Sequence, residues 1–181
     1  IVWCPKCKSP TGDHDRLIGE GVRPEEFVLV KFKINEAYLV AGTFRPETIF
    51  GTTNIWINPD VTYVLAKIDD ERWIISKRAA QKLVNQARKV EVIEEFGGEE
   101  LLGKLAKVPL IERSVYILPA SFVSEDIATG VVYSVPAHAP LDWLALKDLK
   151  QDPEFLKKYK IDPEILSSIE PISIIKTEKY G

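Results

Sequence analysis

The sequence predicts a mixed α and β fold in which a β-barrel-like core is surrounded by peripheral helices. Three observations support this class. Most of the chain consists of short segments with strand patterns, a single helix pattern interrupts them in mid-chain, and further short helix patterns follow near the end. Strands and helices do not alternate regularly, so a doubly wound parallel sheet is not expected. With 181 residues, 45% of them hydrophobic, the chain is long enough to bury one core.

The predicted strands show apolar and polar alternation, or short apolar runs bounded by turn residues. The first two, at 27–34 and 38–42, are joined by a short polar turn and are expected to form a hairpin. The remaining strands are expected at 54–57, 63–68, 72–75, 89–96, 105–110, 115–119, 130–134 and, near the end of the chain, 172–176.

The helix patterns have clear start signals. Residues 76–87 begin with Ser76 as a capping residue and continue with strong helix formers and apolar side chains three and four residues apart. A second helix is expected at 141–149. Shorter helices are expected within 153–159 and 163–168, where Asp-Pro pairs place proline at the first helical position.

Composition and charge exclude several classes of protein. The apolar stretches are much shorter than the roughly 20 residues that cross a bilayer, so no membrane segment is expected. A net charge of −3 is not typical of a protein that binds nucleic acid through a general positive field. The first residue is Ile and no leader pattern follows, so we expect a piece of a longer, cytoplasmic protein. The absence of Met and the many Ile, Glu and Lys resemble the composition of hyperthermophile proteins.

Residues 1–24 form a loop-rich lead-in, and 25–181 are expected to form the main domain. Cys4 and Cys7 are too few and too close together to staple a domain of this size, so a reducing compartment is expected. The pair is half of a zinc site, with His14 as a weak third candidate. The alternatives are a tight turn with free thiols, or a small zinc-dependent structural domain. We expect no zinc in this chain by itself.

Two segments carry candidate chemistry. The first motif, residues 42–54, reads GTFRPETIFGTTN and follows a predicted strand. Its threonine hydroxyls and free backbone N–H groups can surround an ester or hold a water molecule. The alternative is a threonine-rich turn that caps a short helix at 46–50.

The second motif, residues 128–143, reads ATGVVYSVPAHAPLDW: a strand, a loop bracketed by prolines, and the start of a helix. His138 and Asp142 lie on this loop. An aspartate in this position also occurs as a first-turn helix charge, and a lone histidine is often structural. No serine or cysteine nucleophile with a matching acid is apparent, which favours the structural interpretation of the histidine.

Together the two motifs resemble the editing domain inserted into leucyl-, valyl- and isoleucyl-tRNA synthetases. The resemblance rests on Arg45-Pro46-Glu47-Thr48 and on Thr129-Gly130, a strand, and Pro136-Ala137-His138, with Asp142 four positions after the histidine. The form of the second motif, with the segment 54–60, looks most like the archaeal or eukaryotic leucyl type. Departures from the family pattern are Phe44, Ala128 and Ala139, where relatives often have Thr, Gly and Asp.

The resemblance implies an aminoacyl-tRNA ester hydrolase, acting within a leucyl-tRNA ligase in post-transfer editing of mischarged tRNA-Leu. The alternatives are a valyl or isoleucyl editing domain, or a noncatalytic module that binds the tRNA end. The implied partners are the tRNA-Leu 3′ end carrying a noncognate amino acid and the remaining synthetase domains, without a membrane. No cofactor is implied for editing.

The resemblance also assigns roles to residues. Asp142 is expected to hold the α-ammonium of the amino acid by a charge-assisted bond. Thr48 is expected to exclude cognate leucine and to share one pocket with Asp142. The implied catalytic residues are Thr43, Thr48 and Asp142, and the implied substrate-binding residues are Phe44, Arg45, Thr52, Tyr133, Val135 and His138.

Overall fold

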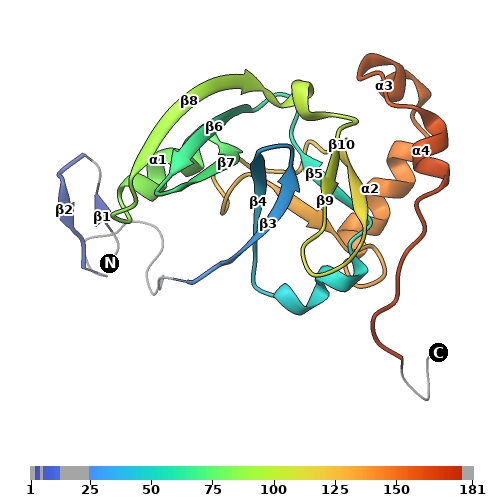
Figure 1. The fold of residues 1–181 in the computed structure, drawn as a ribbon, viewed down its shortest axis with the longest axis horizontal. Helices are drawn as coiled ribbons and strands as arrows, with labels where there is room; N and C mark the ends of the chain where they lie inside the picture. The colour runs from blue at the N-terminus through green and yellow to red at the C-terminus, as the bar shows by residue number, and fades with distance from the viewer. Residues whose placement is uncertain (1–2, 5, 13–24, 177–181) are drawn as a thin grey trace.

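The body of the chain is one mixed β-sheet with helices at its side (Figure 1). The computed structural model describes residues 3–4, 6–12 and 25–176. Within them, two short strands of the lead-in, β1 (Trp3–Cys4) and β2 (Ser9–Pro10), pair with each other. The main sheet consists of β3 (Val28–Ile34), β4 (Ala37–Thr43), β5 (Asn54–Ile57), β6 (Thr62–Ile68), β7 (Glu71–Ser76), β8 (Val90–Gly97), β9 (Leu105–Lys107), β10 (Ser114–Pro119) and β11 (Val132–Ser134).

The strand order of the main sheet is β11-β5-β10-β9-β3-β4-β7-β6-β8. Two of its pairings are parallel, β10 with β5 and β4 with β7, and the others are antiparallel. The predicted hairpin is confirmed: β3 and β4 pair along their whole length, from Val28 opposite Thr43 to Ile34 opposite Ala37. Asn35 makes the connecting turn with a positive φ of 50°, a conformation that asparagine tolerates better than most residues.

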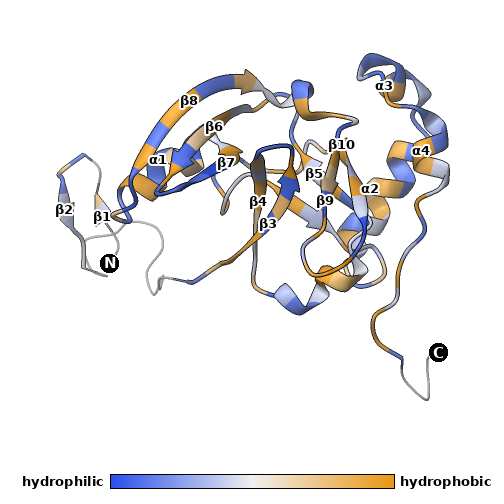
Figure 2. Cartoon of the chain, in the orientation of Figure 1, coloured by the Kyte–Doolittle hydropathy of each residue, from blue (hydrophilic) through white to orange (hydrophobic). Residues whose placement is uncertain are grey.

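The sheet curls around the main hydrophobic core, as the barrel-like prediction requires. The Phe32 ring on β3 lies 5.7 Å from the Tyr133 ring on β11, measured between ring centroids, although the strands are not hydrogen-bonded neighbours. This core also contains Leu39, Ile55 and Ile117, all fully buried. Apolar stretches alternate with polar ones along the curled strands (Figure 2). The hydrogen-bonded order stays open, with β11 and β8 at its ends.

The helices form where the sequence predicts them. Helix α1 (Lys77–Val84) begins at Ser76, whose hydroxyl accepts a bond from the Ala79 N–H, 3.1 Å away. Helices α2 (Pro140–Lys150), α3 (Pro153–Lys158) and α4 (Pro163–Ser167) each have proline at or near their first position. They gather at one side of the sheet, where they bury a second cluster with Trp56, Leu118, Leu146, Leu149, Leu156 and Leu166 (Figure 1). None of the described helices is long and apolar enough to cross a membrane.

Some details differ from the predictions. The strand expected at 105–110 ends at Lys107, because the chain turns and Leu110 takes a positive φ of 68°. Residues 98–101 form a short 3-10 helix, η3 (Gly98–Leu101), directly after β8.

The strand expected at 172–176 is wrong: this segment pairs with no strand in the described part of the chain. Its alternation is real, since Ile172 and Ile174 are half-buried while Ser173 and Ile175 are exposed. The inward side of the segment contacts Gly51 and His138 instead of a sheet edge. The alternating pattern therefore identified the inward side chains but not what they contact.

Candidate active site

The two motifs meet at the carboxyl end of β11. The first motif contains a 3-10 helix, η2 (Pro46–Gly51), where a short helix was expected, and then enters β5. Since β5 pairs with β11, from Asn54 opposite Ser134 onward, the first motif lies next to the second. The backbone N–H of Thr53 adds a hydrogen bond to the Ser134 carbonyl, 3.0 Å away.

A second contact between the motifs involves Ala128 and Gly42. Ala128 has a positive φ of 48°, in the left-handed region that favours glycine. Its side chain faces Gly42, where an added Cβ would lie only 2.6 Å from the Ala128 Cβ. The first motif therefore needs glycine at position 42 to make room for the alanine at 128.

Three oxygen atoms join Thr48, Tyr133 and Arg45. The Thr48 hydroxyl donates to the Arg45 carbonyl at 2.8 Å, and the Tyr133 hydroxyl donates to the same carbonyl at 2.9 Å. The two hydroxyl oxygens are 3.0 Å apart. Two hydroxyl hydrogens can satisfy only two of these three contacts at once. The Thr48 hydroxyl is thus engaged by protein atoms in this structure.

Asp142 lies in the first turn of α2 and is only 6% exposed. One carboxylate oxygen accepts a hydrogen bond from the Trp56 indole N–H at 3.1 Å, and the other accepts one from the Val135 backbone N–H at 2.8 Å. Burial raises the pKa of Asp142, and these two hydrogen bonds oppose that rise in part. Within the described residues, no cationic side chain forms an ion pair with this carboxylate.

The other residues of the first motif have distinct environments. The Thr43 hydroxyl accepts a bond from the Arg45 N–H at 3.0 Å, so these two residues shape the turn before η2. Phe44 is exposed and stacks on Phe27, with ring centroids 4.1 Å apart. Thr52 is fully buried and its hydroxyl donates to the Ile49 carbonyl, which makes it a helix-end residue in this structure.

Thr48 and Asp142 both lie beside the end of β11 but contact different neighbours. Thr48 contacts Tyr133, whereas Asp142 contacts the backbone of Val135 and the ring of Trp56. Tyr133 and Val135 belong to the main core, and Trp56 belongs to the cluster under α2. The sharing of one pocket by the two side chains therefore remains a prediction.

His138 contacts the end of the chain. Its Nε2 accepts a hydrogen bond from the Ile174 N–H at 3.0 Å. The ring also lies near η2, since its Cδ2 is 3.8 Å from the position of a Cβ added to Gly51. The Nε2 atom is therefore already engaged by the protein.

Sequence reasoning missed three buried residues on the paired strands β5 and β11. Trp56 holds the carboxylate directly. Asn54 and Ser134 are opposite each other on β5 and β11, and the amide nitrogen of Asn54 and the hydroxyl of Ser134 have no hydrogen-bond partner among the described residues. The available signal was a polar residue at the edge of an apolar run: Asn before Ile-Trp-Ile, and Ser after Val-Val-Tyr.

The lead-in forms a tight turn at the cysteine pair. The Cys7 N–H donates to the Cys4 sulfur at 3.4 Å, and this bond lowers the pKa of the Cys4 thiol. Both thiols are free. No group of three or more potential metal ligands occurs in residues 3–4, 6–12 and 25–176, and His14 lies outside these ranges. Zinc binding stays untested.

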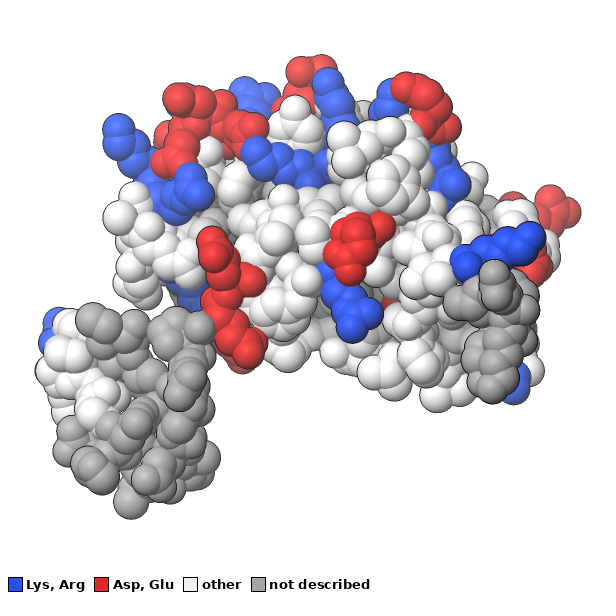
Figure 3. All heavy atoms as spheres, turned by 90° about the horizontal axis from the view of Figure 1, so that it is seen from below, with Lys and Arg blue, Asp and Glu red and all other residues white. Residues whose placement is uncertain are grey.

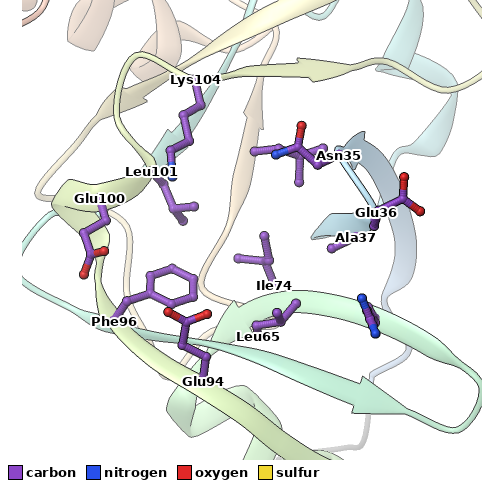
Figure 4. A pocket seen from close by; sticks show the side chains of 12 residues that line it. Asn35, Glu36, Ala37, Leu65, Ile74, Glu94, Phe96, Glu100, Leu101 and Lys104 are labelled. Carbon is purple, nitrogen blue, oxygen red and sulfur yellow. The ribbon is translucent and has the colours of Figure 1, made fainter.

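A separate pocket of about 270 Å³ contains no predicted site residue. It lies between the β3–β4 turn, strands β6 to β8 and η3. Its apolar lining is formed by Ala37, Leu65, Ile74, Phe96 and Leu101, and charged side chains surround it, including Glu36, Glu94, Glu100 and Lys104 (Figure 4). The pocket and the motifs are therefore distinct regions of the fold.

The chain is similar to known proteins over its whole length. A family model described as leucyl-tRNA synthetase, editing domain, matches residues 25–172. The leucine–tRNA ligase of Pyrococcus abyssi is 54% identical over 189 aligned residues, and that of Methanothermobacter thermautotrophicus is 46% identical over 181. Both alignments cover the whole of this chain but only about a fifth of the relative, 20% and 19%.

Solved structures show the same fold. The crystal structure of GlLeuRS-CP1 superposes with a TM-score of 0.73 at 29% identity, covering 81% of this chain and 70% of that one. The editing domain of the P. knowlesi cytosolic leucyl-tRNA synthetase gives a TM-score of 0.70 at 20% identity, with 80% and 70% covered. The family match, the archaeal relatives and the fold lead to one conclusion: this chain belongs to the leucyl-tRNA synthetase editing-domain family.

Proposed function

We propose that this chain is the hydrolytic editing domain of a longer cytoplasmic leucyl-tRNA synthetase. It cleaves the ester between the 3′ end of tRNA-Leu and a noncognate amino acid. One methylene group in a binding pocket provides only about 1 to 3 kcal/mol of discrimination, so a synthetase for an aliphatic amino acid benefits from a second, hydrolytic selection. Related synthetases for other aliphatic amino acids illustrate the same need for a second selection step.

The carboxylate of Asp142 is the observation that carries the proposal. A buried carboxylate is stable when it is paired with a cation as well as hydrogen-bonded. Asp142 has two neutral donors, Trp56 and Val135, and each of its oxygens retains a free lone pair. The α-ammonium of an aminoacyl ester supplies the missing positive charge and three N–H donors. This complementarity favours an aminoacyl group over a plain nucleotide.

The remaining residues act by position rather than by covalent chemistry. A water molecule attacks the ester carbonyl, and the backbone N–H groups and hydroxyls of the first motif orient it and stabilise the developing oxyanion. Thr43 and Arg45 shape that turn through their mutual hydrogen bond. The Thr48 methyl limits the size of the amino-acid side chain, with Tyr133 and Val135 forming the neighbouring wall. We propose no cofactor for this reaction.

Binding of a nonhydrolysable aminoacyl-adenosine analogue tests the proposal directly. In a crystal soaked with an analogue that carries an amide in place of the ester, we expect the α-ammonium within hydrogen-bond distance of Asp142 and the amino-acid side chain toward Thr48. The matched control is the corresponding analogue without its amino group, which should bind more weakly. Binding of both analogues elsewhere, for example only in the pocket of Figure 4, would overturn the proposal.

The charge distribution leads to a prediction about tRNA affinity. On the face seen in Figure 3, Lys and Arg are interspersed with Asp and Glu and do not form a basic stripe. With a net charge of −3, the chain should neutralise few phosphates. We expect weak binding of uncharged tRNA, with Kd of about 10⁻⁴ to 10⁻⁶ M and a log–log salt slope of magnitude about 2 or less.

Titration of labelled tRNA at several salt concentrations measures both quantities. Tight binding with a steep slope would contradict the prediction, because it would show that the fold assembles a basic surface.

A further inference from the structure

The segment 171–176 lies across both motifs. Its Ile172 and Ile174 side chains are half-buried, while the residues between and after them are exposed, so one edge of this extended segment faces the protein. The Ile174 N–H donates to His138 Nε2 at 3.0 Å. Just before it, the Lys150 ammonium on α2 donates to the Ile169 carbonyl, also at 3.0 Å. The segment is thus held to the second motif at His138, and the chain just before the segment is held to α2 at Lys150.

On the first motif, the segment contacts Gly51. A Cβ added to Gly51 would lie 3.1 Å from the Ile172 carbonyl oxygen and 3.3 Å from the Ile174 Cγ2, closer than ordinary contacts. The absence of a side chain at the end of η2 therefore lets the segment approach the backbone. The same added Cβ would be 3.8 Å from the His138 ring. Gly51, His138 and the terminal segment meet at one point.

We propose that residues 171–176 form a strap that fastens η2 to the loop 135–139, and that His138 is a positioning residue of the editing site. The inference rests on the proposed function only for its catalytic consequence. Because the Ile174 N–H is the donor, Nε2 is the acceptor in this bond and is not available to donate to a substrate. Nε2 of His138 binds the strap at Ile174. This role differs from the substrate contact that the family resemblance implies for His138.

The strap has a clear physical effect on the site. η2 carries Thr48, and the loop 135–139 precedes Asp142. A contact that joins the two fixes the distance between the group that selects the side chain and the group that holds the ammonium. Displacements of about 1 Å in such an arrangement cost up to roughly 100-fold in rate. Loosening the strap should therefore lower kcat while KM changes little.

Substitutions at His138 separate the hydrogen bond from the bulk of the ring. His138→Gln retains an acceptor at a reach similar to Nε2, whereas His138→Leu retains bulk without an acceptor. We expect His138→Leu to lose the hydrogen-exchange protection of the Ile174 amide and to lower kcat roughly 10- to 100-fold on isoleucyl-tRNA-Leu. His138→Gln should recover most of both. In the unchanged chain, imidazole ¹⁵N shifts should report the Nδ1–H form.

Gly51→Ala perturbs the same contact from the other motif. The added methyl must displace the strap by a few tenths of an ångström, so the Ile174 amide should again lose protection and kcat should fall. Because both substitutions break one contact, the double variant with His138→Leu should be little worse than either single one. Glu47→Ala, at an exposed site on η2, serves as the control and should leave the Ile174 amide protected.

The outcomes distinguish the strap from the proposed function. Protection of the Ile174 amide and the ¹⁵N shifts test the strap without any hydrolysis. If both single variants keep that protection, or if they lose it with kcat unchanged, the inference is overturned. If the unchanged chain does not hydrolyse mischarged tRNA within its parent protein, the proposed function fails while the structural measurements still test the strap.

Discussion

Replacement of Asp142 by alanine is expected to lower the rate of hydrolysis of isoleucyl-tRNA-Leu by roughly 30- to 5000-fold. The range corresponds to about 2 to 5 kcal/mol for loss of a desolvated charge pair. The pair in question is the Asp142 carboxylate and the α-ammonium of the substrate. Since every aminoacyl ester carries this ammonium, the loss should be similar for all amino acids, and a deacylation assay measures it directly.

Asp142→Ala also removes protein contacts, so the variant needs a second measurement. The Trp56 indole and the Val135 amide would each lose their acceptor in a buried site, at a cost of about 1 to 3 kcal/mol per group. Part of any rate loss could therefore reflect a displaced loop. The substrate offers an independent way to remove the charge pair: an α-hydroxyacyl-tRNA has a hydroxyl where the aminoacyl-tRNA has its ammonium.

A cycle of two proteins and two substrates isolates the pair. The unchanged chain should hydrolyse the aminoacyl ester much faster than the α-hydroxyacyl ester, whereas Asp142→Ala should treat them nearly alike. Asp148→Ala removes an exposed carboxylate from the same helix and should retain the full preference. If the unchanged chain and Asp142→Ala show the same preference for the aminoacyl ester over the α-hydroxyacyl ester, the carboxylate stabilises the loop and does not bind the ammonium.

The sequence predicts the strands well because this fold depends on local patterns. Alternation in 27–34 and the short apolar run 38–42, with a polar turn between them, specify both the conformation and the partner of each strand, since neighbouring strands in a hairpin pair with each other. The terminal segment lacks that local partner. Ile172 and Ile174 have the same alternation, yet their contacts are with Gly51 and His138, far away in sequence. The period of the apolar side chains identifies which face of a segment is buried. It does not identify the residues that this face packs against.

The site shows the same limit. The resemblance implies that the two motifs lie together, and both border the strand pair β5 and β11. It does not reveal that Trp56 binds Asp142, since that contact depends on which side of β5 the helix α2 covers. Nor does it separate Thr48 from Thr52. Both are threonines of one short motif, but a single turn of η2 buries Thr52 entirely and leaves Thr48 half-exposed.

Thr48 is expected to act through its methyl group, and three substitutions test this. Thr48→Ser keeps the hydroxyl that donates to the Arg45 carbonyl and removes only the methyl. Thr48→Val keeps the shape and removes the hydroxyl, and Thr48→Ala removes both. If the methyl excludes the cognate side chain, Thr48→Ser and Thr48→Ala should hydrolyse leucyl-tRNA-Leu, and Thr48→Val should not. Relief of one methyl clash corresponds to about 1 to 3 kcal/mol, or roughly 10- to 200-fold in rate.

The variants should remain folded, because Tyr133 still donates to the Arg45 carbonyl when the Thr48 hydroxyl is absent. Isoleucyl-tRNA-Leu is the control substrate, since its hydrolysis should change little in the three variants. Deacylation of both tRNAs within the parent synthetase provides the measurement. If Thr48→Val instead hydrolyses leucyl-tRNA-Leu as fast as Thr48→Ala does, while Thr48→Ser behaves like the unchanged chain, discrimination depends on the hydroxyl. The hydrogen bonds to Arg45 and Tyr133, rather than steric exclusion, would then set the specificity.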